Sequence, residues 1–423
     1  MTMAPPEKRL LKGFNEVVTV DPALTSDGNP LGLIKNGAIA LEGTTIAWVG
    51  PGHAIPAAWQ GVPSEDFSGQ VVFPGFIDSH THPVFGGDRA DEFEQRLQGK
   101  TYLDIAAAGG GIAKTVRETR VASLETLVEQ TTTHLATSMA FGVTTVEAKS
   151  GYGLDVDSEL KSLAAINEAA QRLPLTVIPT FMGGHDIPPE FKGNPNGYVD
   201  HLIGDMLPAI ADQGIARHND VFCEAGYFDV AQSRRILEAG MGYGLKPRIH
   251  TNEFEDIGGI PMACEVGCLS ADHLLNTSPE GIRQLAASHT VATVLPGTAF
   301  YLKVPRYAPA RALIDAGATV ALATDFNPGS CMSQNLQLMM VLGCLHMAML
   351  PHEAIQAVTL NAAKALGLED DRGSVTSGKR ADLALFNLTS HHQLLYHYGV
   401  NHLSRLYVAG QVVRGFCTEP ATA

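Results

Sequence analysis

The chain has 423 residues, of which 17% are charged, and its formal net charge at pH 7 is −15. This length exceeds one ordinary domain but suits a barrel of about 250 residues with an appended domain. The small share of charged residues indicates a large buried core. The acidic balance argues against nucleic acid and against anionic membranes as partners.

Cysteine usage and the terminal segment indicate the compartment. The chain has six cysteines, the last of them Cys417, and none forms a Cys-x-x-Cys pair. So few thiols in a long chain indicate reduced cysteines. Residues 1–13 are polar and lack the apolar core of a secretory leader. The most apolar run, 338–350, is too short to span a bilayer and predicts a buried helix. We therefore expect a soluble cytoplasmic protein.

Both ends of the chain have strand patterns. Within residues 14–73, the apolar runs 38–41 and 46–49 flank Glu42-Gly43-Thr44-Thr45, which is typical of a hairpin with a glycine turn. Strand and turn patterns return at 373–375, 378–386, 406–408 and 410–413. Because the N-terminal segment alone would make a thin sheet, we expect residues 1–73 and 371–423 to form one composite β-domain.

Strand and helix patterns alternate between these ends. The predicted strands cover residues 76–82, 143–148, 176–181, 221–224, 248–250, 269–273, 291–295 and 320–324. The predicted helices cover 123–141, 157–172, 198–211, 230–239, 261–266, a helix capped by Ser278 with Pro279 at its first position, 309–316, 335–349 and 352–366. Eight such units predict an α/β fold, a (β/α)8 TIM-like barrel over residues 74–370. A doubly wound open sheet is the alternative.

The chain is organised around Pro74–Pro83, where an apolar run leads into His80 and His82. Residues i and i+2 of a strand point to the same face, so the two imidazoles project together. Two neutral imidazoles so placed make half of a tetrahedral site for a zinc- or iron-like ion. A pair of surface histidines in a loop is the alternative.

Active sites of such barrels form at the C-terminal ends of the strands. The polar residues at those positions are His80 and His82, then His250 followed by Glu253, then Asp272-His273, and finally Asp325 followed by Asn327-Pro328-Gly329-Ser330. Three imidazoles and a carboxylate (His80, His82, His250 and Asp325) could surround one ion and leave a position for water, as in catalytic metal sites. Any one of these histidines alone could equally be a hydrogen-bonded core residue.

Several motifs resemble a known family over essentially the whole chain. Pro74–His82 and Gly378-Lys379-Arg380-Ala381-Asp382-Leu383 resemble the amidohydrolase superfamily. Within it, the chain is similar to the imidazolonepropionase family of histidine degradation. The segments that carry this closer similarity are Phe85-Gly86-Gly87-Asp88-Arg89, Glu147-Ala148-Lys149-Ser150-Gly151-Tyr152-Gly153-Leu154, Phe181-Met182-Gly183-Gly184-His185 and Thr324–Ser330.

The resemblance implies a cofactor, a substrate and partners. It implies one zinc or iron ion per chain, held by His80, His82, His250 and Asp325, and a homodimer. The implied substrate is a small molecule with a carboxylate tail, imidazolone-5-propionate. The residues implied to contact substrate or product are Arg89, Tyr152, His185, Glu253, Asn327, Gly329 and Ser330.

The chemistry of these side chains agrees with such a substrate. An acidic protein needs a fixed cation for the tail, and Arg89 offers a planar fork suited to a carboxylate. A surface salt bridge with a neighbouring aspartate is the alternative for Arg89. Tyr152 and Ser330 supply hydroxyl donors, with turn chemistry as the alternative. His185 could bond a ring nitrogen or oxygen, or instead cap a helix.

The expected reaction is metal-assisted hydrolysis of the cyclic amide to N-formimidoyl-L-glutamate. Glu253 would accept a proton from water and deliver it to the departing ring nitrogen, a role that Asp325 could share. His273 would stabilise the developing oxyanion. The catalytic residues expected are therefore Glu253, His273 and Asp325.

Three other interpretations stay open. Some members of the superfamily bridge two metals with a modified lysine from the fourth strand. Here the fourth strand ends in Cys223-Glu224, and Lys149 belongs to the second strand, so a two-metal site is disfavoured. Glu224 keeps this interpretation open. A mononuclear deaminase of a nucleobase-like ring would keep the ligands and leave Arg89 idle. A non-catalytic barrel that serves as an interaction module would usually have lost ligands.

Overall fold

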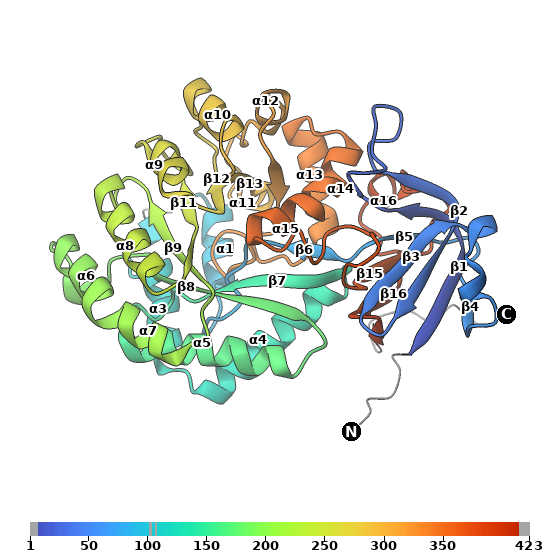
Figure 1. Ribbon diagram of the computed structural model, residues 1–423. Coiled ribbons are helices and arrows are strands. Elements are labelled where there is room, and N and C mark those ends of the chain that lie inside the picture. The colour runs from blue at the N-terminus through green and yellow to red at the C-terminus, as the bar shows by residue number, and fades with distance from the viewer. Residues whose placement is uncertain (1–6, 101–103, 106–107, 414–423) are drawn as a thin grey trace. The chain divides into compact units, whose positions relative to one another are not determined.

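The structure is a computed structural model that describes residues 7–100, 104–105 and 108–413 (Figure 1). Cys417 and the outermost parts of the predicted β-domain segments lie outside the described residues. The chain divides into two compact units. Unit 1 comprises Met1–Asp78, Thr137–Thr145 and Asn335–Ala423, and unit 2 comprises Ser79–Ala136 and Val146–Gln334. The predicted domain boundaries after residues 73 and 370 stay a prediction.

Unit 1 contains a sheet built from both ends of the chain. Its strand order is β17 (Gln411–Val413), β16 (Leu403–Val408), β15 (Leu383–Phe386), β5 (Val71–Pro74), β1 (Lys8–Val18), β2 (Leu33–Glu42) and β3 (Thr45–Pro51), with β4 (Ser64–Asp66) paired to β1. Strand β15 pairs antiparallel with β5, so C-terminal residues extend the N-terminal sheet as expected. Phe14 and Phe67 stack with their ring centroids 5.2 Å apart in its core. Of the segments predicted as strands and turns, 373–375 is not in a strand, whereas 383–386, 403–408 and 411–413 are.

The predicted hairpin is confirmed. Strands β2 and β3 pair antiparallel, and Glu42 faces Thr45 across the turn. Gly43 has φ 60°, in the left-handed region that glycine enters without the steric cost of a side chain.

The second sheet is the barrel. Its strand order is β14 (Val320–Leu322), β13 (Val291–Val294), β12 (Ser270–His273), β11 (Ile249–Thr251), β9 (His218–Cys223), β8 (Thr176–Gly184), β7 (Val143–Lys149) and β6 (Phe76–Asp78), with β10 (Lys246–Pro247) paired to β9. Strands such as β7, β9 and β13 are buried along their whole length, as parallel strands covered by helices are.

The barrel closes just beyond its first and last strands. The amide of Asp325 donates to the carbonyl of His80 at 3.0 Å, and the amide of His82 donates to the carbonyl of Phe326 at 2.8 Å. Thr81 and Phe326 form a parallel bridge. This closure confirms the (β/α)8 barrel, and the open-sheet alternative is wrong.

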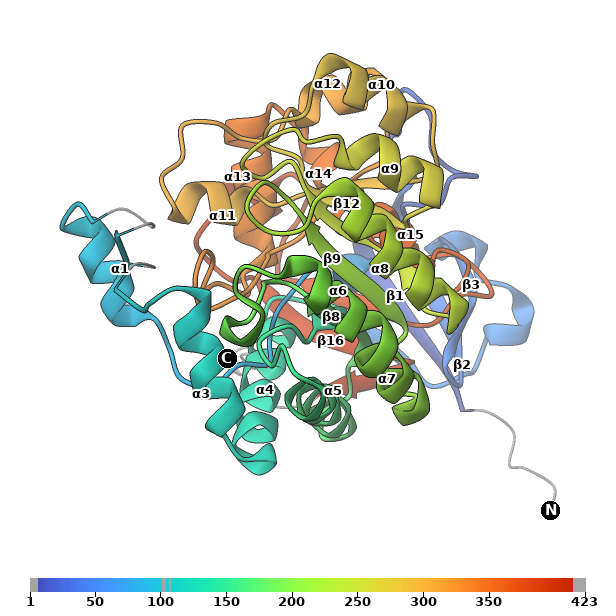
Figure 2. The same cartoon turned by 90° about the vertical axis from the view of Figure 1, so that its left-hand side faces the viewer.

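Helices α5, α7 and α8 of unit 2 lie on the outer side of the barrel strands, along one flank in Figure 2. The helices of the described residues are α1 (Ala90–Leu97), α3 (Ile112–Val121), α4 (Leu124–Met139), α5 (Val156–Gln171), α6 (Pro195–His201), α7 (Leu207–Gln213), α8 (Val230–Gly242), α9 (Gly259–Val266), α10 (Pro279–Ala286), α11 (Pro296–Tyr301), α12 (Ala310–Asp315), α13 (Leu336–Met347), α14 (Pro351–Ala357), α15 (Leu360–Leu366) and α16 (Gln393–Tyr396). Short single-turn or π segments are η1 (Gly52–Ala54), η2 (Ala57–Trp59), η3 (Pro189–Phe191) and η4 (Leu202–Met206).

Two helix predictions need correction. The expected helix 352–366 is two helices, α14 and α15, because Thr359 leaves the helical region at φ −126° and ψ −99°. The expected helix 198–211 is α6 and α7 joined by the π segment η4. Helices α1, α3, α11 and α16 were not predicted.

The structure bears on the expected absence of a membrane span and on the expected state of the cysteines. Among the described residues, no helix is long and apolar enough to cross a membrane. The predicted buried run is mostly α13, which has 12 residues. The five cysteines in the described part of the chain are free thiols.

Candidate functional site

A cavity of about 800 Å³ lies in unit 2 at the C-terminal ends of the barrel strands. It is lined by every predicted site residue except His80, which is fully buried. These lining residues are His82, Arg89, Tyr152, His185, His250, Glu253, His273, Asp325, Asn327, Gly329 and Ser330. The cavity is also lined by residues that sequence analysis missed, among them Arg96, Lys100, Asp186, Phe222 and Lys303.

Four donor atoms of the predicted ligands converge in this cavity. Asp325 Oδ1 lies 3.4 Å from His80 Nε2 and 3.5 Å from His82 Nε2. His82 Nε2 lies 3.3 Å from His250 Nε2. In the described part of the chain, His80 Nε2 is buried without a hydrogen-bond partner. Desolvated donors this close to one another are the arrangement that a bound cation satisfies, so these residues can hold a metal ion.

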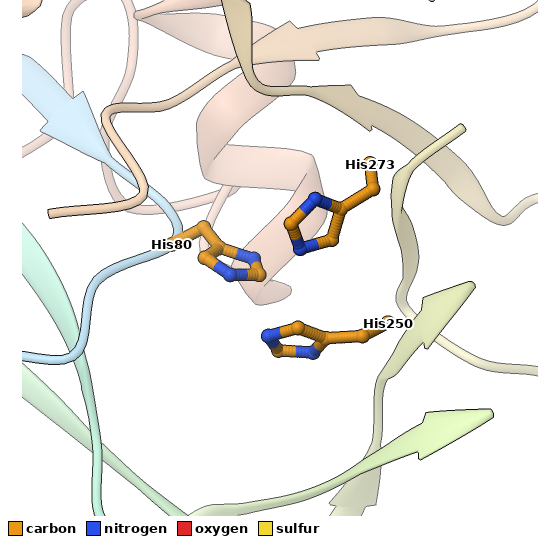
Figure 3. Close-up of side chains that lie close together, drawn as sticks. All are labelled: His80, His250 and His273. Carbon is orange, nitrogen blue, oxygen red and sulfur yellow. The ribbon is translucent and has the colours of Figure 1, made fainter. Parts of the chain in front are cut away.

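His273 joins this cluster from the end of β12. Figure 3 shows the rings of His80, His250 and His273 turned toward one another. The ring centroids of His250 and His273 are 5.1 Å apart, and those of His80 and His250 are 4.4 Å apart. His273 and Asp325 have positive φ angles of 82° and 50°, which side chains rarely adopt and which are concentrated at functional sites.

Burial sets the electrostatics of the cluster. It lowers the pKa values of His80 and His82 well below their usual range, so both rings are neutral and can offer lone pairs. Burial raises the pKa of Asp325 to about 6, against a hydrogen bond from Thr298 that lowers it. Burial, with the charges of Asp325 and Glu224, raises the pKa of Glu253 well above its usual range.

Buried carboxylates orient the ligand rings. Nδ1 of His80 lies 2.7 Å from Asp272 Oδ2, and Nδ1 of His250 lies 3.0 Å from Asp220 Oδ1. With Nδ1–H donating to the carboxylate, each ring turns an unprotonated Nε2 toward the cluster. Sequence analysis missed Asp220, for which the only signal was a charged residue inside the buried strand β9.

The loop that carries Glu253 is held by another buried carboxylate. Glu224, which is 1% exposed, accepts the amides of Glu253 at 2.9 Å, Phe254 at 3.0 Å and Glu255 at 2.9 Å. Asn276 Nδ2 donates to the carbonyls of Glu253 at 2.8 Å and Phe254 at 2.9 Å. The carboxylate that sequence analysis left open as a second metal ligand is thus engaged by backbone amides.

Arg89 is buried and reaches the cavity. Its Nε donates to Glu92 Oε2 at 2.8 Å, whereas the alternative considered above was a surface pair with a neighbouring aspartate. A Cβ atom added to Gly329 would lie 2.3 Å from Arg89 Nη1. Glycine at position 329 therefore leaves the room in which the guanidinium packs against the backbone.

His185 and Tyr152 lie beside the cluster. Nδ1 of His185 lies 2.9 Å from the Gly151 carbonyl, which is in a loop and not at a helix end. Its ring stacks on His82 with centroids 5.0 Å apart. Burial lowers the pKa of His185 to about 3. A neutral ring that donates from Nδ1 leaves Nε2 as an acceptor. The Tyr152 and His185 centroids are 5.1 Å apart.

Asn327 and Ser330 shape one turn at the cavity wall. Asn327 Oδ1 accepts the amides of Gly329 and Ser330, both at 2.8 Å, and Nδ2 donates to Ser330 Oγ at 2.8 Å. These bonds are turn chemistry, the alternative named for Ser330. Their contact with substrate stays a prediction.

Known proteins are similar to this chain along most of its length. The sequence model of the amidohydrolase family matches residues 94–414. An imidazolonepropionase of Geobacillus sp. (strain WCH70) is 47% identical over 396 residues, covering 93% of each chain. One of Alkaliphilus metalliredigens (strain QYMF) is 44% identical over 410 residues, covering 96% of this chain and 97% of the relative. The crystal structure of a triazine hydrolase variant shares the fold, with a TM-score of 0.74 at 18% identity over 98% of this chain and 96% of that one.

Proposed function

Because the chain belongs to the amidohydrolase superfamily, and within it to the imidazolonepropionase family, we propose that it hydrolyses 4-imidazolone-5-propanoate to N-formimidoyl-L-glutamate in histidine degradation. Water adds to the ring carbonyl carbon, the carbon–nitrogen bond of the cyclic amide breaks, and the ring nitrogen takes a proton. The observation that carries the proposal is one cavity that joins a cluster of metal-binding donors to a buried arginine.

One zinc or iron ion per chain is the proposed cofactor, with His80, His82, His250 and Asp325 as ligands. Three imidazoles and one carboxylate suit either metal. Such an ion, when bound, supplies a water of lowered pKa and a Lewis acid for the ring carbonyl. The count of one is supported by Glu224, whose carboxylate is engaged by backbone amides.

Three side chains of the cavity are proposed to act on the reacting atoms. Glu253 accepts the proton of the attacking water and delivers it to the departing ring nitrogen, and Asp325 is the second candidate for this role. His273 donates to the carbonyl oxygen as negative charge develops there. Support comes from their proximity, since His273 Nδ1 lies 3.6 Å from Glu253 Oε2.

The remaining lining residues are proposed to bind and orient the substrate. Arg89 pairs with the propionate tail, because a guanidinium bonds a carboxylate with two parallel donors. His185 and Tyr152 bond the ring, and the 327–330 turn supplies Asn327, Gly329 and Ser330 at the wall.

Product identification tests the reaction. We expect the purified protein to convert imidazolone-5-propionate to formimidoyl-glutamate, to lose this activity on chelation, and to regain it with zinc or iron. Mass spectrometry of the product and an ammonia assay separate the alternatives. Ammonia release from a nucleobase, with no ring opening of the imidazolone, would replace this proposal by the deaminase.

We also propose a cytoplasmic homodimer without a nucleic-acid or membrane partner. Support for self-association comes from exposed apolar side chains of unit 1, Leu345 (72% exposed), Tyr396 (87%) and Tyr398 (67%). Light scattering after size exclusion should give twice the chain mass. Tyr396→Ser with Tyr398→Ser should shift that mass toward one chain, and Tyr243→Ser, at a half-exposed residue of unit 2, should not. A wild-type mass of one chain would contradict the dimer.

A further inference from the structure

We infer that Lys149 and Arg248, two cations buried below the donor cluster, are positioning residues for the metal ion. The side chains of both are fully buried. Placing an ammonium and a guanidinium inside a barrel carries a large desolvation cost unless each is paired. The ion-pair partners of Lys149 and Arg248 therefore indicate the role of each cation. This inference rests on the proposed metal ligands.

Lys149 holds the carboxylate that orients His250. Its Nζ lies 2.8 Å from Asp220 Oδ2 and 2.7 Å from Glu147 Oε1. The other oxygen of Asp220, Oδ1, lies 3.0 Å from His250 Nδ1. One buried aspartate thus bridges a fixed cation and a ligand ring, and removing the lysine leaves that aspartate without one of its ionic partners.

Arg248 holds the carboxylate that orients His80. Its Nη2 donates to Asp272 Oδ2 at 3.0 Å and to the Ser79 carbonyl at 2.7 Å. Asp272 Oδ2 lies 2.7 Å from His80 Nδ1. We call each of these series of contacts an arm. One arm runs from Lys149 on β7 through Asp220 to His250. The other runs from Arg248, the residue before β11, through Asp272 to His80.

The cations also decide where a metal ion binds. Asp220, His250 and Asp272 offer ligand atoms within 4.8 Å of one another, so a second group of donors lies behind the rings. Lys149 and Arg248 neutralise the two carboxylates of that group. A divalent ion is then favoured on the Nε2 side, where Asp325 is the nearby carboxylate. Each ring is held with Nδ1–H toward its aspartate and its Nε2 lone pair toward the ion.

The test measures zinc affinity by competition with a chromophoric chelator, without substrate. Lys149→Met should weaken zinc binding by about 10- to 100-fold, the usual effect of losing an outer partner of a metal ligand. If Lys149 acts through Asp220, Lys149→Met with Asp220→Asn should bind zinc about as well as Asp220→Asn alone. Arg248→Met and Asp272→Asn repeat the comparison on the other arm, in case one variant fails to fold.

A matched control separates positioning from stability. Arg372, a buried cation of unit 1, bonds Asp371 and Thr145, and Arg372→Met should lower the melting temperature without changing zinc affinity. Unchanged zinc affinity in a folded Lys149→Met or Arg248→Met variant would overturn the inference. Losses of zinc affinity that add fully in the double variants would also overturn the inference, because the cation would then not act through its aspartate. Because no substrate is used, failure of the proposed hydrolysis leaves this result interpretable.

Discussion

Glu253→Gln is expected to lower kcat for imidazolone-5-propionate by about 10²- to 10⁴-fold, the usual contribution of a general acid–base group. The amide keeps the shape of the side chain and cannot carry the proton. Glu253 is not a proposed metal ligand, so the variant should retain its metal. Steady-state kinetics and metal analysis of the same sample measure both.

The position of Glu253 explains why the effect should be large. Its loop is fixed from both sides, since Glu224 accepts the amides and Asn276 donates to the carbonyls. The backbone that carries the Glu253 side chain is therefore fixed, which reduces the reorganisation needed to bring its carboxyl group to the reacting atoms. Glu255→Gln is the matched control, because this exposed neighbour lies in the same loop and should retain normal kcat.

The pH dependence gives a second measurement on the same variant. Burial raises the pKa of Glu253, so its carboxyl group takes up a proton at a higher pH than an exposed glutamate. A proton acceptor must be ionised, and kcat should therefore fall as the pH is lowered through the pKa of Glu253. Glu253→Gln should lose that acidic limb. Near-normal turnover by metal-loaded Glu253→Gln would show that another group moves the proton.

The fold was predictable because the barrel repeats one signal. Each buried strand is a short apolar run bounded by helical periodicity, and the observed strands differ from the predicted ones by only a few residues, as at β7 (143–149 against 143–148). The segment between residues 90 and 121 was harder. Helices α1 and α3 are short, have many charged residues and begin without a side-chain cap, so the usual signals of a helix start are missing.

The site was partly predictable because barrel topology converts sequence positions into spatial ones. Strand ends that are far apart in the chain meet at one face, so His80 and Asp325 could be grouped before the structure was known. No such rule identifies Asp220, which bonds His250, Thr298, which bonds Asp325, or the pairing of Lys149 with Asp220, because these partners are set by how neighbouring strands and loops pack. The motifs identified the family, and the relatives confirm it.

Arg89→Met is expected to raise KM for imidazolone-5-propionate by roughly 30- to 150-fold, which corresponds to about 2–3 kcal/mol for charge-assisted bonds to a carboxylate. The change in kcat should be smaller, because the tail is bound in both the ground state and the transition state. Methionine keeps much of the apolar volume of the arginine stem. Steady-state kinetics measures both constants.

The structure offers an independent way to move the same guanidinium. Gly329→Ala would place a Cβ atom 2.3 Å from Arg89 Nη1, closer than any contact allows, so the guanidinium must shift. KM should then rise in the same direction, by about tenfold for a loss near 1.4 kcal/mol. Gly204→Ala is the matched control, since a Cβ atom there meets nothing within 4 Å.

An uncharged substrate analogue decides whether Arg89 recognises the tail. The propionamide of the same imidazolone keeps the ring and removes the negative charge. If Arg89 pairs with the carboxylate, wild type and Arg89→Met should have similar kcat/KM for the amide and very different values for the acid. Equal losses on both substrates would instead mean that Arg89 supports the cavity wall through Glu92, to which its Nε donates at 2.8 Å. The cationic residues Arg96, Lys100 and Lys303 would then be the next candidates for binding the tail, because they line the same cavity.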